Sequence, residues 1–194
     1  MDVRLLTDDD LVKACAARQA EALGELVRRY QDPLLGYLAK FLGDPRLAED
    51  LTQEAFMRVY AKSGTYRSGP KFTTWLYTIA TNLARDSHKY ARRHPAGPLA
   101  PSDALDLRST EPDPEAAALR RERGERVRRA LDALPEDTRE VLLLRDVQGL
   151  SYEEIAQVQG TPVGTAKSRV ARARMAFKDV YVAHGGITTS LLTP

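Results

Sequence analysis

The chain has 194 residues, of which 43% are hydrophobic and 29% are charged, and its formal net charge is +2. This composition fits a soluble intracellular protein with one or two small cores. It argues against a membrane protein, because there is no run of about 18 apolar residues and the N-terminus lacks the basic start and apolar stretch of a signal peptide. We therefore expect a cytoplasmic protein that does not associate with membranes.

Residue types that carry catalysis or metal binding are sparse. The single cysteine, Cys15, rules out an internal disulfide and a cysteine-based zinc cluster, and its apolar neighbours predict a buried thiol rather than a redox sensor. The histidines His88, His94 and His184 have no ligand-like partners at helical spacing, and no glycine-rich phosphate loop follows a strand. No nucleophile, base and orienting group stand out, so we expect no catalytic residues, no metal and no cofactor.

Helical spacing of apolar residues dominates the chain, which predicts an all-α fold. Thr7 and Asp10 form a capping pair, and the triplet Asp8 to Asp10 is interpreted as a helix start rather than a metal site. The apolar positions that follow are Leu11, Leu23, Leu26, Val27, Tyr30, Leu34, Leu38 and Phe41.

Two more helices are predicted beyond the break at Gly43-Asp44-Pro45. The first covers residues 46–62 and ends at the turn-rich segment SGTYRSGPK. The second covers residues 72–93 and is amphipathic. Its apolar side consists of Phe72, Leu76, Ile79, Ala80 and Leu83.

The composition changes between residues 95 and 119, where prolines and acidic residues replace large apolar ones. Such a segment stiffens the chain and offers little to pack, which predicts a linker. The result is two small helical domains, at residues 1–94 and 120–183, with a loose tail at 184–194. The second domain is expected to begin with a basic helix near Arg120.

Residues 151–178 have the pattern of a helix-turn-helix that reads DNA. Ser151 and Glu154 form a capping box that starts the first helix. Gly160 tolerates positive φ in the turn, while Thr161 is predicted to cap the second helix with Pro162 in its first turn.

The second of these helices has two distinct faces at 3.6 residues per turn. One stripe is apolar: Val163, Ala166, Val170, Ala173 and Phe177. Opposite it lie Gly164, Ser168, Ala171 and Arg172, with Lys167, Arg174 and Lys178 on one flank and Arg169 on the other. Residues 162–178 contain five cations and no acid. A solvated amphipathic helix normally mixes both charge signs, so a DNA-reading helix is favoured.

Three segments resemble a known family, the extracytoplasmic-function (ECF) class of bacterial RNA polymerase sigma factors. Residues 134–174 are similar to its promoter-reading C-terminal domain, and AEDLTQEAFMRVY followed by FTTWLYTIATNLARD is similar to its N-terminal domain. Both occur in the family's order, joined by a short proline-rich linker. The final HGGITTSLLTP matches no recognised motif.

The resemblance implies how a promoter would be read. The C-terminal helix-turn-helix would bind the −35 element as duplex, through Thr165, Lys167, Ser168, Arg169, Ala171 and Arg172. The N-terminal domain would capture the −10 element as an opened strand, through Tyr66, Arg67, Lys71, Asn82, Arg85 and Lys89. Asn82 matches a position that touches an extruded base in relatives. Trp75 is expected in the core rather than as a stacking platform.

The resemblance also implies partners: core RNA polymerase, promoter DNA and an anti-sigma protein that covers the polymerase-binding faces. With Leu47, Leu51 and Ala55 pointing inward, the docking face would present Asp50, Gln53, Glu54 and Arg58. The function implied is that of a sigma factor. The alternative is a helix-turn-helix regulator that does not join polymerase, which would leave the polar face of residues 46–60 without a role.

Overall fold

The protein is described by a computed structural model over residues 2–67, 69, 71–94 and 114–185. Every regular element in these ranges is helical, so the predicted all-α fold is confirmed. The first domain contains η1 (Val3–Leu5), α1 (Asp8–Ala16), α2 (Ala20–Leu42), α3 (Pro45–Lys62), η2 (Ser63–Thr65) and α4 (Phe72–Arg93). The second contains α5 (Pro114–Asp132), α6 (Glu136–Leu142), the π-helical η3 (Leu143–Val147), α7 (Tyr152–Gln159) and α8 (Val163–Ala183).

Local capping fixes where the first helices begin. The Thr7 hydroxyl accepts from the Asp10 backbone N–H at 3.2 Å and donates to the Asp10 carboxylate at 2.7 Å, as the sequence predicts. The helical pattern that follows is divided between α1 and α2 by a turn in which Arg18 has φ 63°, an uncommon conformation for a residue with a side chain. The left-handed Gly43 (φ 71°) ends α2, and the Asp44 carboxylate caps α3.

The apolar stripes meet in the first domain as predicted. Most of the stripe residues of α2 and α4 are buried, with Leu23, Val27 and Tyr30 half-buried against the core, and Cys15 packs with them. Burial raises the pKa of the Cys15 thiol, which keeps it protonated and unreactive. The stripe residues that are buried are Leu26, Leu34, Leu38, Phe41, Phe72, Leu76, Ile79, Ala80 and Leu83.

The first helix after the predicted linker begins earlier than the sequence indicates. Helix α5 starts at Pro114, inside the segment 95–119 that the sequence predicts as linker. Residues 95–113 of that segment and residues 186–194 of the predicted tail lie outside the described residues. The apolar run from Val141 to Leu144 is fully buried beneath α8 and α7, as its composition requires.

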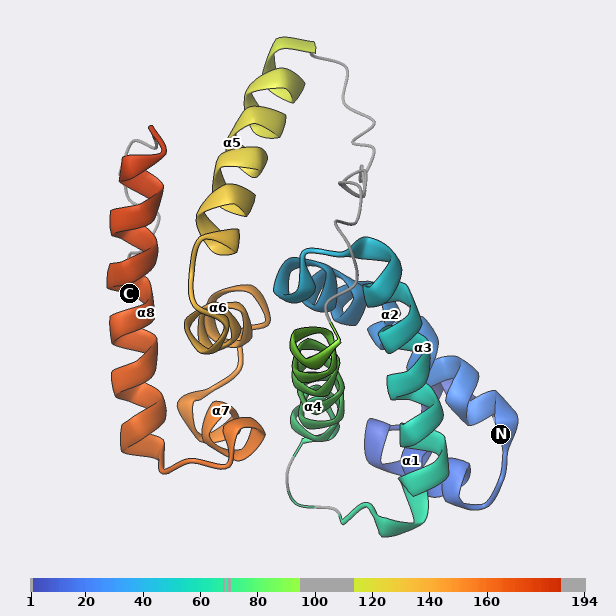
Figure 1. The fold of residues 1–194 in the computed structure, drawn as a ribbon. Coiled ribbons are helices and arrows are strands. Elements are labelled where there is room, and N and C mark those ends of the chain that lie inside the picture. The colour runs from blue at the N-terminus through green and yellow to red at the C-terminus, as the bar shows by residue number, and fades with distance from the viewer. Residues whose placement is uncertain (1, 68, 70, 95–113, 186–194) are drawn as a thin grey trace.

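Helix α4 lies between the rest of its own domain and the second domain (Figure 1). On one side it packs against α2 and α3, and on the other against α7, while η3 lies against α2. The two domains therefore form one continuous core, and this arrangement decides which surface residues remain accessible.

Candidate nucleic-acid and polymerase interfaces

The helix-turn-helix begins with the predicted capping box. The Ser151 hydroxyl accepts from the Glu154 backbone N–H at 3.1 Å, and the Glu154 carboxylate accepts from the Ser151 N–H at 2.7 Å. Gly160 adopts the left-handed conformation at φ 63° and ends α7. The turn is therefore specified by the residues that the sequence singles out.

The prediction that Thr161 caps α8 (Val163–Ala183) is wrong. Within the described chain, the buried Thr161 hydroxyl has no hydrogen-bond partner. The first carbonyl accepting helical hydrogen bonds is that of Pro162, from Thr165 at 2.9 Å and Ala166 at 3.1 Å. Pro162 is thus the N-cap and α8 begins at Val163, so Thr161 lies one residue too early to cap it.

The two faces of α8 have the predicted orientation. Ala166, Val170 and Ala173 are buried, with Val163 and Phe177 half-buried at the ends of the stripe. The opposite face is exposed and consists of Gly164, Ser168, Ala171 and Arg172. The small side chains of Ser168 and Ala171, and the absence of one at Gly164, leave room for another surface to approach the helix closely.

The five cations of α8 differ in their surroundings. Lys167, Arg172 and Lys178 are exposed. The Arg169 guanidinium donates to the Gln159 side-chain oxygen at 3.1 Å, and Arg174 makes two bonds to the Asp146 carboxylate, at 2.5 and 3.1 Å. The outer face thus presents exposed cations together with one arginine whose direction is fixed by α7.

Two further residues join the cationic surface, and sequence analysis missed both. The Tyr152 ring, at the first position of α7, has the Arg145 guanidinium 4.6 Å and the Lys167 ammonium 5.7 Å from its centroid. Both separations suit cation–π attraction. An aromatic residue directly after the Ser151 cap was the signal available for Tyr152, whereas Arg145 is placed by the π-helical turn of η3.

The predicted strand-capture residues fall into two groups. Asn82 and Lys89 are exposed on the outer stripe of α4, and Arg67 is exposed after η2. The half-buried Tyr66 packs its ring 4.9 Å from that of Trp75. Trp75 is itself only partly buried and packs against the core, as expected of a core aromatic.

The second group faces the other domain. The Arg85 guanidinium makes two hydrogen bonds, of 2.8 and 2.6 Å, to the Glu140 carboxylate, which is completely buried. Lys71 forms an ion pair of 3.2 Å with Glu154. His88 contacts Glu136 at 3.0 Å on the same stripe of α4. Both predicted cations are therefore engaged by acids of the second domain.

Glu140 connects the two domains through a chain of hydrogen bonds. Burial opposes the charge of Arg85, but the hydrogen bonds and negative charge of Glu140 outweigh it and raise the pKa of that guanidinium. The Gln159 side-chain N–H donates to the same carboxylate at 2.9 Å, and the Gln159 side-chain oxygen accepts from Arg169. A continuous polar chain thus runs from α4 to the cationic helix α8.

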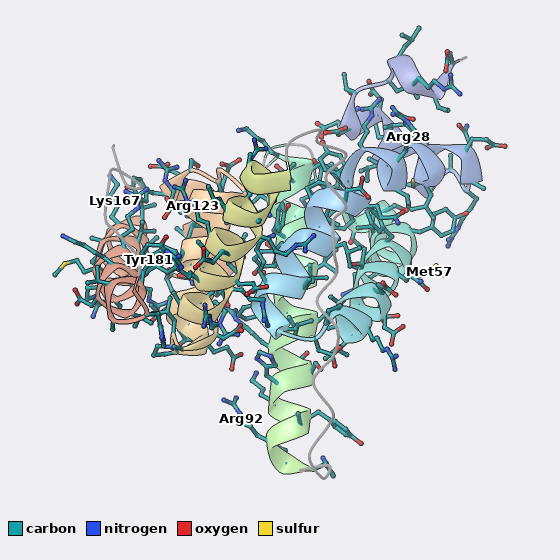
Figure 2. All side chains as sticks on the ribbon, turned by 90° about the horizontal axis from the view of Figure 1, so that it is seen from above. Arg28, Met57, Arg92, Arg123, Lys167 and Tyr181 are labelled. Carbon is teal, nitrogen blue, oxygen red and sulfur yellow. The ribbon has the colours of Figure 1, made fainter. Side chains whose placement is uncertain are left out.

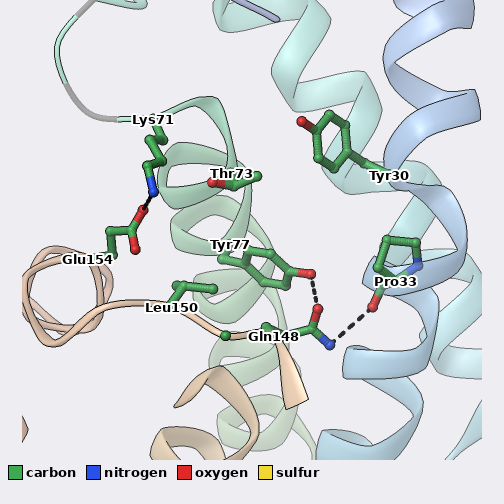
Figure 3. Close-up of a pocket in the computed structure, with 9 residues that line it drawn as sticks. Tyr30, Pro33, Lys71, Thr73, Tyr77, Gln148, Leu150 and Glu154 are labelled. Atoms are coloured by element: carbon green, nitrogen blue, oxygen red, sulfur yellow. Dashed lines mark hydrogen bonds and ion pairs between the residues drawn. The ribbon is translucent and has the colours of Figure 1, made fainter. Parts of the chain in front are cut away.

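A cleft of about 250 Å³ lies where the domains meet (Figure 3). The Lys71–Glu154 pair crosses one side of it. On the other side Tyr77 donates to the Gln148 side-chain oxygen, and the Gln148 amide donates to the Pro33 carbonyl at 3.4 Å. Two hydrogen bonds and one ion pair therefore connect residues of the two domains at this cleft.

The predicted polymerase-docking face lies on α3. Ala55 is buried and Leu47 and Leu51 are half-buried, so the helix has the expected orientation. Asp50, Gln53 and Glu54 are exposed, and Arg58 is half-buried in an ion pair of 2.8 Å with Glu54. Met57 is 60% exposed on this face, which the sequence pattern did not single out. It lies on the opposite side of the molecule from Lys167 (Figure 2).

In the part of the chain that the structure describes, no group of three or more His, Cys, Asp or Glu side chains is placed to bind one metal ion. Among the same residues, none of the helices is both long and apolar enough to span a lipid bilayer.

These features define a two-domain helical protein with a cationic helix-turn-helix at one end and an exposed polar face of α3 at the other. Family models agree, since Sigma-70 region 2 matches residues 26–94 and Sigma-70 region 4 matches residues 124–177. The chain belongs to the ECF sigma factors of bacterial RNA polymerase, and its function is to direct core polymerase to promoters. A regulator that does not join polymerase is not favoured.

Individual relatives cover most of the chain. The RNA polymerase sigma-H factor of Pseudomonas aeruginosa is 41% identical over 178 residues, which are 88% of this chain and 91% of that protein. The ECF RNA polymerase sigma-E factor of Escherichia coli is 36% identical over 182 residues, 89% of this chain and 93% of that protein.

Two solved structures share the fold. CnrH, solved with the cytosolic domain of CnrY, has a TM-score of 0.68 and 25% identity over 91% of this chain and 97% of its own. The sigma factor RpoE of Bartonella quintana, solved with the anti-sigma factor NepR, has a TM-score of 0.61 and 26% identity over 81% of this chain and 94% of its own.

Proposed function

We propose that the two domains divide the promoter between them. Residues 1–94 hold polymerase and capture the −10 strand, residues 120–183 read the −35 duplex, and residues 95–119 connect them. The observation that carries this proposal is the outward face of α8, which combines small side chains with exposed cations. The protein acts in the cytoplasm, where its polymerase is, and has no catalytic activity of its own.

The duplex reader is built on α8. Arg172 and Lys167 donate to base edges or phosphates from the exposed face, and Ser168 and Ala171 let the helix enter the major groove. Arg169 is pre-oriented by Gln159. With Thr165, which is half-buried at the first turn, these residues form the −35 site.

The strand reader is built around α4 and the segment before it. The exposed Asn82 amide can pair with the Watson–Crick edge of an extruded base. Arg67 and Lys89 supply positive charge from exposed positions, and Tyr66 supplies a ring. Lys71 and Arg85 complete the set once they leave Glu154 and Glu140.

Reading both elements together requires the domains to separate. The −35 and −10 elements are about 25 base pairs apart, or about 85 Å at roughly 3.4 Å per base pair. Helix α4 packs directly on α7. While the domains are packed in this way, the two proposed readers are too close together to bind both elements of one promoter. The packed form is accordingly that of the free protein.

The polymerase site is the face of α3 that presents Asp50, Gln53, Glu54 and Arg58. Met57 adds an exposed apolar side chain in the middle of these polar groups, which is the composition of an interface anchor with a polar rim. An anti-sigma protein that covers this face would hold the chain inactive. The co-structures of CnrH and RpoE with their regulators support this partner.

The test is transcription in vitro with core polymerase on fragmented genomic DNA, followed by mapping of start sites. The parent protein is expected to start transcripts downstream of one shared pair of elements. The double variant Asp50→Lys/Glu54→Lys is expected to lose core binding and transcription while its duplex binding is kept.

The matched control is Glu21→Lys/Asp32→Lys, which makes the same charge change at exposed positions of α2. This control is expected to transcribe like the parent. Parent-like core affinity in the α3 double variant would contradict the docking assignment.

A further inference from the structure

Four aromatic rings form a row at the start of α4. Neighbouring ring centroids are 5.1 Å apart from Tyr30 to Phe72, 6.2 Å from Phe72 to Trp75 and 4.9 Å from Trp75 to Tyr66. The pairs are tilted or edge-on, which are the favoured geometries for aromatic contacts. The row ends at Tyr66, directly before Arg67, so it leads from α2 to the proposed strand-capture residues.

Both ends of the row are held by consecutive carboxylates of α1. The Tyr30 hydroxyl donates to Asp8, and the Tyr66 hydroxyl donates to Asp9 at 2.7 Å. Burial raises the pKa of both phenols well above its ordinary value, and the neighbouring carboxylates raise it further. Both hydroxyls therefore remain protonated donors across the physiological pH range.

Helix α1 is a firm base for these contacts because Arg29 ties it to α2. Its guanidinium bonds to the Asp8 carboxylate at 2.8 Å and to Glu25 at 2.7 Å, and donates to the carbonyls of Arg4 and Leu6 at 3.0 Å. Arg28 and Arg29 together hold the pKa of Glu25 at about 2, so this anchor stays charged.

The segment that receives this support is poorly fixed by its own sequence. It contains Gly64 and Gly69 around Tyr66, and glycine loses more backbone freedom on ordering than any other residue. Helix α1 packs directly on η2, where this segment begins. Helix α1 (Asp8–Ala16) lies outside residues 26–94, the part matched by the Sigma-70 region 2 model. A side-chain anchor from α1 can thus order a turn that local propensity leaves loose.

We propose that Asp9 is a positioning residue for strand capture, holding Tyr66 so that the turn bearing Arg67 is set beside α4 before the strand arrives. Asp8 fixes the opposite end of the aromatic row through Tyr30. The proposal rests on the proposed role of Tyr66 and Arg67 at the −10 element. It gives Asp8 and Asp9 a function beyond starting the helix.

The test is a double-mutant cycle with Asp9→Ala and Tyr66→Phe in the full-length chain bound to core polymerase. The readout is permanganate reactivity of the −10 element on a linear promoter. Each single variant is expected to reduce open complex by about tenfold, as for loss of one hydrogen bond to a charged group. The double variant is expected to be no worse than either single one, because all three remove the same bond.

Two further variants separate positioning from folding. Asp9→Asn keeps an acceptor for the Tyr66 hydroxyl and is expected to recover most of the opening. Asp10→Ala makes the same charge change in the same turn, but Asp10 bonds to Thr7 and Lys13, so parent-like opening is expected. Core affinity and −35 duplex binding are expected to be unchanged in all of these variants.

The outcomes distinguish this proposal from the one on which it rests. If Tyr66→Ala abolishes opening while Asp9→Ala and Tyr66→Phe open like the parent, Tyr66 belongs to the capture site and Asp9 does not position it. Additive losses in the double variant would also overturn the proposal. If Tyr66→Ala opens normally, the assignment of Tyr66 to the −10 site fails as well.

Discussion

The outer face of α8 and the corresponding face of α4 carry the two proposed DNA readers, yet they differ in accessibility. On α8 the groove-facing residues are exposed, and Arg169 is already oriented by Gln159. Of the proposed strand-capture residues on α4, Asn82 and Lys89 are exposed, whereas Arg85 is hydrogen-bonded to the buried Glu140. In the free chain the duplex reader is therefore complete, while the strand reader becomes complete only when the domains part.

The largest effect is expected from releasing Arg85. Glu140→Gln keeps the shape of the side chain but removes the charge that holds the guanidinium. Breaking a buried pair costs about 3–5 kcal/mol, and we expect the low end, about 3 kcal/mol, because the Arg85 side chain is 25% exposed. Small-angle scattering of the free chain should show an increased radius of gyration. Glu153→Gln on the exposed side of α7 is the control. Equal radii of gyration for the two variants would contradict the claim that the Glu140 charge keeps the α4 face covered while the α8 face is accessible.

The next effect concerns the face that is already accessible. Arg172→Ala is expected to weaken binding of a −35 duplex by about 1–3 kcal/mol, the usual cost of losing a good base-edge contact. The loss should be the same in the Glu140→Gln background, because α8 is exposed in both. Fluorescence anisotropy with promoter and scrambled duplexes measures it, with Arg123→Ala on α5 as the control. Promoter affinity equal to that of the parent would contradict the groove-facing assignment.

A smaller loss is expected at the exposed part of α4. Asn82→Ala removes the amide proposed to pair with an extruded base, which should lower open-complex formation by about 1–2 kcal/mol while initial duplex binding is unchanged. Permanganate footprinting of the −10 element measures the change. Asp86→Ala, on the same exposed stripe, is expected to melt the promoter normally. Identical melting and base preference in Asn82→Ala and parent would place the pocket elsewhere.

The smallest effect is expected at the flank of α8. Lys178→Ala should lower affinity evenly for all duplexes and reduce the slope of log affinity against log salt by about one unit, since one phosphate contact is lost. A salt titration of duplex binding shows whether this is so. A change in sequence preference instead of slope would mean that Lys178 reads bases.

Local patterns predicted the geometry of the helix-turn-helix well. The capping box of Ser151 and Glu154, the left-handed Gly160 and the alternate faces of α8 depend on residues only a few positions apart. Such spacing is set by helical geometry and is visible in sequence. The exception is Thr161, which has the right chemistry for a cap but precedes the true N-cap by one residue.

The covered face of α4 could not be predicted in the same way. Arg85 and Glu140 are 55 residues apart, and neither has a local pattern that points to the other. Their pairing is decided by how two domains pack, and hydrophobic periodicity carries no information about a polar interface of that kind. The sequence analysis made no prediction for Met57, which the structure places 60% exposed on the polar face of α3.

The most direct test of domain separation is a distance between the two readers. Spin labels at Asp86→Cys on α4 and Asp179→Cys on α8 replace exposed acids, and the buried Cys15 can stay in place. Pulsed electron resonance of the free chain should give one short distance. Bound to core polymerase on promoter DNA, the same pair should be separated by several tens of ångström, on the order of the roughly 85 Å between the elements. The same short distance in both states would contradict the account.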